Sequence, residues 1–284
     1  MNDIFKKCNK QQKKSKAYTF FRGTAQMNEW QIILIAGCVV FCTFTVEGIA
    51  GFGATVMALP FVAMLIGVEK AVPMLSSMSV LLSLFLVLRS WRDLDLKEYL
   101  FVVLHVGAGV PVGLFMMEFL PEDLLLAVLV CFIFFVGIRG LLLLRRQNKT
   151  VSYSEKPCKK SFFFRLILFL GGIIQGAFSS GGPVVVMYAS KALKEKSKFR
   201  AVLSSLWLTT NTIMVAKWTL SGKVWTPQLG KMILCALPFV VCGMIFGDHL
   251  HHRVEQRKFT FLVYTVLIIA GCMLGGNLVY KMVF

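Results

Sequence analysis

Charged residues are scarce in this sequence: they make up 16% of its 284 residues, against about 25% in soluble domains. Apolar residues reach 57% and the mean hydropathy is +0.72, which excludes both a soluble globular protein and an intrinsically disordered one. At about 20 apolar residues per helical span, the chain after residue 30 can supply about eight to ten crossings of a bilayer. The composition therefore predicts one all-α polytopic protein of the cell membrane, whose surroundings are the lipid bilayer.

The sequence also lacks the residue clusters that hold metals or cofactors. None of the eight cysteines forms a C-x-x-C pair, and the ligand spacing of a metal site with histidine or carboxylate neighbours does not occur. We therefore predict no metal, no cofactor and no catalytic residue. The net charge of +17 comes without a nucleic-acid-binding motif, and cytoplasmic loops of membrane proteins are basic. No nucleic-acid partner is expected.

Charge and hydropathy divide the chain into four parts. Residues 1–30 form a basic tail without a sustained apolar run, which we expect to be flexible and to face the cytosol or the membrane surface. Residues 147–161 form a basic linker between two transmembrane repeats, 31–146 and 162–284. The apolar segments lie at about 31–67, 71–88, 98–117, 124–144, 162–190, 201–220, 229–247 and 259–280.

Two of these segments contain helix-breaking residues at corresponding places. Shifting the sequence by 128 residues lays Gly48 on Gly176 and Gly53 on Gly181, and three ordinary spans follow the broken segment in each half. Freed backbone groups persist in a membrane only where protein or a water-filled cavity covers them. A kink in a packed helix is the alternative for one such segment, but two in register point to a transporter binding site.

Loop charges indicate how the two halves are oriented. If each broken segment folds back on itself, the halves are inverted, and the loops on one side carry 17 Lys and Arg residues against 5 on the other. If each broken segment crosses once, the halves are parallel and the count becomes 13 against 9. The positive-inside rule favours the inverted arrangement, although this places the basic tail outside. The cytoplasmic loops are then 89–97, 145–160, 191–200 and 248–258.

The second break carries the residues of an anion site. A helix that begins at Pro183 would direct its free amides and positive dipole end into the break, and such an end attracts anions. The predicted binding residues of this break are Gln175, Ser179, Ser180, Gly181, Gly182 and Pro183. Their counterparts in the first break are Gly51, Gly53 and Thr55, and Ser205 and Asn211 on a later span complete the predicted site. Local capping is the alternative for each serine.

Ionisable residues within the spans are few, and each is a functional candidate. Glu47 directly precedes the first break, at the repeat position of Gln175, and is a candidate proton-coupling group or counter-ion. As a carboxylate it would repel an anion, so a protonated or paired state is implied. His105 lies in mid-span, where a neutral hydrogen-bonded histidine is the alternative. Arg200 follows the second break, where it would draw anions to the cytoplasmic mouth or anchor a lipid phosphate.

These motifs resemble those of the sulfite exporter TauE/SafE family of membrane transporters. The likeness covers about residues 31–281 and rests on Gly48-Ile49-Ala50-Gly51-Phe52-Gly53 with Pro60, and on Gly181-Gly182-Pro183 with Tyr188 and Phe199-Arg200-Ala201. The resemblance implies export of small anionic sulfur compounds, such as sulfite or organosulfonates, driven by an ion gradient. Ser179-Ser180 before the glycine pair, and Glu47 in the first break, depart from the family pattern.

We therefore predict a secondary transporter that exports a small anion, which binds between the two broken helices near the membrane midplane. Protons or another ion are the expected coupling partner, and the sequence makes no prediction of oligomeric state. An anion or solute channel is the alternative, because the same breaks can line a pore. An intramembrane enzyme would need a cluster of carboxylate, histidine or cysteine in one plane, and Glu47 and His105 alone do not form one.

Overall fold

The computed structural model describes residues 28–146, 161–193, 195–222, 225–250 and 256–283. The predicted basic tail and linker therefore lie almost wholly outside the described residues. Within these ranges the regular structure is helical, without a strand, which confirms the predicted all-α class. The α-helices are α2 (Glu29–Ala50), α3 (Ala54–Ile66), α4 (Val68–Ser90), α5 (Leu96–Phe119), α6 (Glu122–Arg146), α7 (Phe162–Phe178), α8 (Gly182–Ala192), α9 (Lys196–Ser221), α10 (Pro227–Leu250) and α11 (Gln256–Val283).

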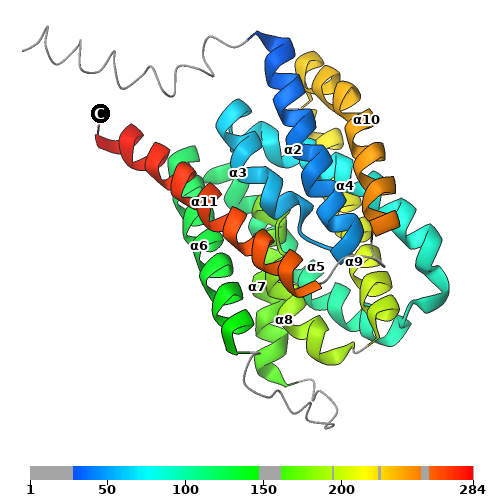
Figure 1. The fold of residues 1–284 in the computed structure, drawn as a ribbon. Helices are drawn as coiled ribbons and strands as arrows, with labels where there is room; N and C mark the ends of the chain where they lie inside the picture. The colour runs from blue at the N-terminus through cyan, green and yellow to red at the C-terminus, as the bar shows by residue number, and fades with distance from the viewer. Residues whose placement is uncertain (1–27, 147–160, 194, 223–224, 251–255, 284) are drawn as a thin grey trace, which may run out of the picture.

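The helices are those of a multi-pass membrane protein. Five described stretches are long and apolar enough to cross a bilayer: Trp30–Ile49, Val68–Asp93, Leu96–Phe119, Glu122–Leu142 and Pro227–Leu250. Shorter apolar helices cover Ala54–Ile66, Phe162–Phe178 and Tyr264–Gly276. Helix α9 is equally long but richer in polar residues, and it lies along α4 (Figure 1). Its polar residues are therefore available to an internal site.

Both segments that were predicted to be broken are broken. In the first, α2 ends at Ala50 and α3 begins at Ala54, and between them Gly51 and Gly53 have φ of +79° and +106°. Glycine adopts such left-handed conformations without the steric cost that other residues meet. In the second, α7 ends at Phe178 and α8 begins at Gly182, one residue before the predicted start.

Helices of the two halves pair reciprocally (Figure 1). Helix α2 lies along α10 and α7 lies along α5, while α4 pairs with α9 and α6 with α11. Exchanging each helix for its counterpart in the other half leaves this set of pairs unchanged. The pattern supports the predicted duplication, but the division into the repeats 31–146 and 162–284 stays a prediction.

Glycines bring the backbones of two of these pairs into contact. A Cβ atom added at Gly113 of α5 would lie 2.0 Å from the carbonyl oxygen of Ile173 in α7. One added at Gly247 of α10 would lie 2.4 Å from the carbonyl oxygen of Thr45 in α2. Small residues permit this close approach in membranes, so the first helix of each broken segment is held against a neighbouring span.

Ion pairs show which helix ends lie together. Asp248, at the end of α10, binds Arg89 at the end of α4 at 3.0 Å and Arg200 near the start of α9 at 2.7 Å. Lys217, about 25 Å further along α9 at 1.5 Å per residue, binds Glu118 at the end of α5 at 3.0 Å. The loops next to residues 89, 200 and 248 therefore share one end, as the inverted arrangement requires and the parallel one does not. We call this the Arg200 end.

Candidate functional site

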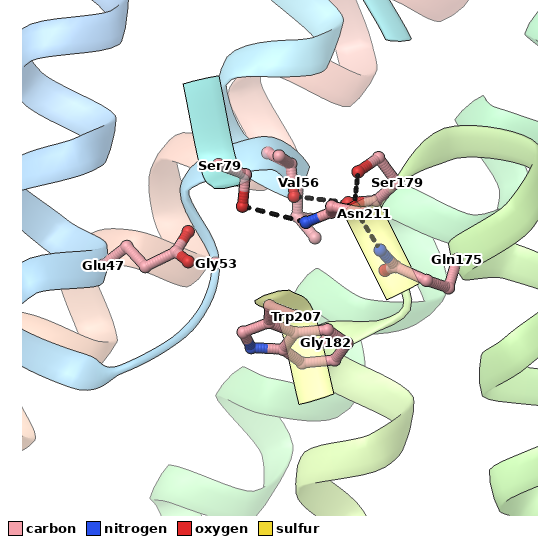
Figure 2. Close-up of a pocket in the computed structure, with 10 residues that line it drawn as sticks. Glu47, Gly53, Val56, Ser79, Gln175, Ser179, Gly182, Trp207 and Asn211 are labelled. Atoms are coloured by element: carbon pink, nitrogen blue, oxygen red, sulfur yellow. Dashed lines mark hydrogen bonds between the residues drawn. The ribbon is translucent and has the colours of Figure 1, made fainter. Parts of the chain in front are cut away.

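A cavity lies where the two breaks meet α4 and α9 (Figure 2). About 10 Å³ of it is accessible to the centre of a water molecule, which is room for about one water. Seven of its ten lining residues were predicted from the sequence, and Val56, Ser79 and Trp207 were not. The lining consists of Glu47, Gly53, Thr55, Val56, Ser79, Gln175, Ser179, Gly182, Trp207 and Asn211.

Asn211 of α9 is the hub of the polar side of the cavity (Figure 2). Its Oδ1 atom accepts hydrogen bonds from Gln175 Nε2 at 2.8 Å and from Ser179 Oγ at 2.9 Å. Its Nδ2 atom donates to Ser79 Oγ of α4 at 3.0 Å. The side chain is 1% exposed, and buried polar groups are stable when bonded in this way. One amide thus ties α4, α7 and the second break to α9.

The second break is fixed on both sides of Ser179. This residue has φ +52°, which makes it the one non-glycine residue with positive φ in the described part of the chain. Its carbonyl oxygen accepts a hydrogen bond from Thr55 Oγ1 of α3 at 2.5 Å, so the two broken segments are joined directly. Two residues further on, the N–H of Gly181 donates to Gln175 Oε1 at 3.0 Å. The break is therefore closed by side chains that line the cavity.

The first break is closed by a carboxylate. Glu47 Oε2 accepts a hydrogen bond from the N–H of Ala54, the first residue of α3, at 2.9 Å. Glu47 is 3% exposed, and no basic side chain of the described residues forms an ion pair with it. An amide at the start of a helix carries partial positive charge and attracts anions. The start of α3, the counterpart of the helix start predicted at Pro183, is thus occupied by a carboxylate of the same chain.

The lining of the cavity includes several neutral hydrogen-bond donors. The amide nitrogens of Asn211 and Gln175 each carry a second proton, and the Ser79 hydroxyl, which accepts from Asn211, retains its own. The indole N–H of Trp207 has no hydrogen-bond partner among the described residues. No lysine, arginine or histidine belongs to the lining. A small oxyanion is the type of ligand that such neutral donors suit.

Five predicted binding residues lie outside this lining. Gly51 faces Arg200 instead, because a Cβ atom added to it would lie 3.2 Å from Arg200 Cγ. Ser180 donates to the carbonyl oxygen of Phe178 at 2.9 Å, which matches the local alternative. The others outside the lining are Gly181, Pro183 and Ser205. Asn211 therefore reaches the cavity without Ser205, its expected partner across a pore.

Two predicted coupling or gating residues also lie outside the lining. His105 Nδ1 is 2.7 Å from the carbonyl oxygen of Phe101, one turn earlier in α5, and the two rings are 4.5 Å apart. This matches the hydrogen-bonded alternative for His105. Arg200 binds Asp248 at the Arg200 end, so its charge is paired rather than free. Of the three, only Glu47 lines the cavity; the roles of all three stay predictions.

Two of the lining residues that were not predicted occupy matching positions of the predicted repeat. The shift of 128 residues that aligns the breaks lays Ser79 on Trp207, and both residues line the cavity. The neighbouring serines of α4 do not identify Ser79 as a lining residue, because Ser76 and Ser77 instead donate to carbonyl oxygens of their own helix. The alignment pairs these two positions, but it does not by itself indicate that either one faces the cavity.

A family match covers both breaks and the cavity. A family model described as "Sulfite exporter TauE/SafE" matches residues 35–274. The chain is also similar to the "Probable inner membrane transporter protein TsaS" of Comamonas testosteroni, with 23% identity over 109 residues. That similarity covers 38% of this chain and 46% of the relative, so the chain spans less than half of the relative's length. No solved structure matches the chain.

Proposed function

Because the chain belongs to the sulfite exporter TauE/SafE family, we propose that it is a secondary transporter that exports a small oxyanion, such as sulfite or an organosulfonate. The observation that carries the proposal is a cavity that residues of both helix breaks line together. Broken helices that meet near the midplane are the usual form of a transporter site. The similarity to a protein named as a probable inner membrane transporter supports a location in the inner or plasma membrane.

The neutral donors of the cavity suit a transported anion. Asn211, Gln175, Ser79 and Trp207 provide hydrogen bonds without a fixed positive charge, so the anion can be bound and then released. The cavity holds about one water-sized group, so an oxyanion requires the breaks to separate. We infer that the broken segments α2–α3 and α7–α8 move relative to α4 and α9, as expected of alternating access.

Glu47 is the proposed coupling group. Its carboxylate bonds the first amide of α3, beside the place where the anion would be bound. Two like charges repel strongly in a site of low dielectric constant, so anion binding requires a proton or another cation at Glu47. This requirement would couple the movement of the anion to an ion gradient.

Flux measurements in proteoliposomes test the proposal. The purified chain is reconstituted with sulfite inside, and efflux is measured with and without a proton gradient. We expect efflux that saturates and responds to the gradient, and Asn211→Leu should reduce it by about tenfold or more, because a hydrogen bond to a charged group contributes about 1.5–3 kcal/mol. Ser205→Ala, on the same helix but outside the cavity, is the matched control and should retain parental flux.

Two outcomes would contradict this reading. Undiminished flux in Asn211→Leu, with an unchanged melting temperature, would remove the cavity as the site. Flux that rises linearly with concentration and ignores the proton gradient would indicate the channel alternative.

A further inference from the structure

A second charged group lies next to the first break. The Arg200 cluster consists of Arg89, Arg200 and Asp248, from the ends of α4, α9 and α10. The side chains of Arg200 and Asp248 are 12% and 13% exposed, whereas that of Arg89 is 67% exposed. Two guanidinium groups share one carboxylate, and no other acidic side chain in the described part of the chain pairs with either. The cluster therefore carries one net positive charge.

Two buried polar atoms beside this cluster have no hydrogen-bond partner. They are Arg200 Nε and, one helical turn further along α9, the hydroxyl of Ser204, which is 0% exposed. Buried polar atoms in proteins are nearly always bonded. Elsewhere on α9 the hydroxyls of Thr209 and Thr210 bond carbonyl oxygens of their own helix. Residues four apart share one face of a helix, so the side chains of Arg200 and Ser204 leave α9 on the same face.

The cluster adjoins the cavity. Trp207, which lines the cavity, is seven residues along α9 from Arg200, about 10 Å at 1.5 Å per residue. The Arg200 side chain also lies against Gly51 of the first break. An anion that leaves the cavity toward the Arg200 end would therefore meet these donors next.

We propose that Arg89, Arg200 and Ser204 form a second oxyanion site between the cavity and the Arg200 end, and that Asp248 occupies it with its own carboxylate in this structure. The inference rests on the proposed function for the identity of the ligand. A sulfite or sulfonate group presents oxygen pairs to guanidinium much as a carboxylate does, so the anion can replace Asp248. Asp248 is then a tethered competitor that closes the site when no substrate is present. A lipid phosphate has the same chemistry, and the experiment separates the two sources.

Cysteine modification tests the site without any need for transport. Ser204→Cys is introduced into the full chain, alone and with Asp248→Asn, and the protein is placed in nanodiscs of neutral lipid. Modification of residue 204 by an anionic sulfonatoethyl methanethiosulfonate and by its cationic trimethylammonium analogue is followed by peptide mass spectrometry. Asp248→Asn should raise the rate for the anionic reagent, and its ratio to the cationic one, by about tenfold, because the freed arginines attract anions. Adding Arg200→Gln should remove this preference.

Controls separate charge, folding and lipid. Glu118→Gln makes the same change of acid to amide in the ion pair at the opposite end, and it should leave both rates unchanged. Sodium methanesulfonate, a sulfonate that reacts neither with the reagents nor with disulfides, should slow the anionic reagent in Asp248→Asn, whereas sodium chloride of equal ionic strength should not. Melting temperatures report whether each variant is folded, and a variant that does not fold is replaced by Asp248→Ser.

The proposal is overturned if Asp248→Asn leaves the two reagents equally reactive, or if the preference survives Arg200→Gln. Protection by phosphatidylglycerol in the nanodiscs, without protection by methanesulfonate, would assign the arginines to lipid headgroups and would also overturn it. Because these readouts record access and charge only, their failure leaves the proposed transport intact. Absence of sulfite efflux from proteoliposomes, in contrast, would reject the proposed function. The modification rates would still show whether the Arg200 cluster attracts anions.

Discussion

The first break holds a carboxylate where the second holds an amide. Glu47 accepts a hydrogen bond from the N–H of Ala54, and Gln175, at the matching repeat position, accepts one from the N–H of Gly181. Either side chain closes its break with one acceptor oxygen, so closing a break does not require a charge. The charge of Glu47 is therefore superfluous to the fold, which supports a role in coupling.

The two breaks also differ in how firmly they are held. The second turns at Ser179, whose hydroxyl bonds Asn211 and whose carbonyl oxygen bonds Thr55. The first turns at two glycines, and a Cβ atom added at Gly53 would meet nothing within 4 Å. The second break is thus tied to α9 through Asn211, whereas the first has free space beside Gly53. We infer that the first break moves further than the second when the cavity opens.

Replacing Gly181 of the second break should give the largest loss of sulfite flux. A Cβ atom at Gly181 would lie 2.4 Å from the carbonyl oxygen of Gly171, whereas one at Gly182 would lie 3.7 Å from its nearest neighbour, Trp207. Forcing a methyl group into packed backbone costs about 1–3 kcal/mol or more. We expect Gly181→Ala to lower sulfite flux by about a hundredfold and to lower the melting temperature, since about 1.4 kcal/mol corresponds to each tenfold.

Gly182→Ala is the matched control for packing, with a melting temperature close to that of the parent because an ordinary contact is not disturbed. Equal losses in the two variants would mean that the break needs glycine for flexibility rather than for space. Close packing would then no longer explain why the second break is held more tightly than the first.

Exchanging the acid and the amide tests the difference in charge directly. Glu47→Gln should keep the hydrogen bond to Ala54 and bind sulfite, but the response of efflux to a proton gradient should fall by about tenfold, a typical loss for a positioned proton-transfer group. Gln175→Glu should instead weaken sulfite binding by about tenfold or more, because it brings a second carboxylate to the cavity. Efflux against a pH gradient and sulfite titration measure the two effects.

Both variants should fold, since each retains an acceptor oxygen at its break. If Glu47→Gln remained fully responsive to the gradient, the charge of the first break would have no part in coupling. A Gln175→Glu variant with parental affinity would show that the anion does not approach Gln175.

The positions of the breaks could be predicted from the sequence because glycine and proline have local effects. Gly51, Gly53 and Pro183 act through their own dihedral angles, and the structure has a break within one residue of each prediction. The membrane class followed from composition for a similar reason, since apolar length sets the number of spans.

The rest of the cavity depends on helix pairing that no local rule supplies. Ser79 reaches Asn211 across 132 positions of sequence because α4 lies along α9. The ion pair of Arg200 with Asp248 arises in the same way from the ends of α9 and α10. Polar residues such as Ser79 and Ser205 look alike in the sequence, and only the packing of their helices decides which one faces the cavity.

Ser179 offers a smaller test of how the second break is held. Ser179→Ala removes the hydrogen bond to Asn211 and keeps a side chain in the left-handed conformation, while Ser179→Gly removes the same bond but is free of that steric cost. We expect Ser179→Ala to lower the melting temperature, because the lost bond costs about 1 kcal/mol. Ser179→Gly should lower it less or leave it unchanged, because relief of the left-handed conformation, about 1–2 kcal/mol, offsets that loss. Thermal unfolding in detergent measures the order. The reverse order would mean that rigidity of the chain at residue 179, rather than its hydrogen bond, holds the break.

His105 should give the smallest effect, and it tests whether proton coupling is confined to the first break. Its ring is bonded to the carbonyl oxygen of Phe101 in its own helix and does not line the cavity. His105→Gln keeps a hydrogen-bonding side chain of similar length, so we expect sulfite flux and its response to a proton gradient to change by less than about twofold, as for a residue outside the site. Measured beside Glu47→Gln in the same proteoliposomes, a loss of coupling in His105→Gln would place a proton path in α5. The contrast between the carboxylate of the first break and the amide of the second would then not be the source of coupling.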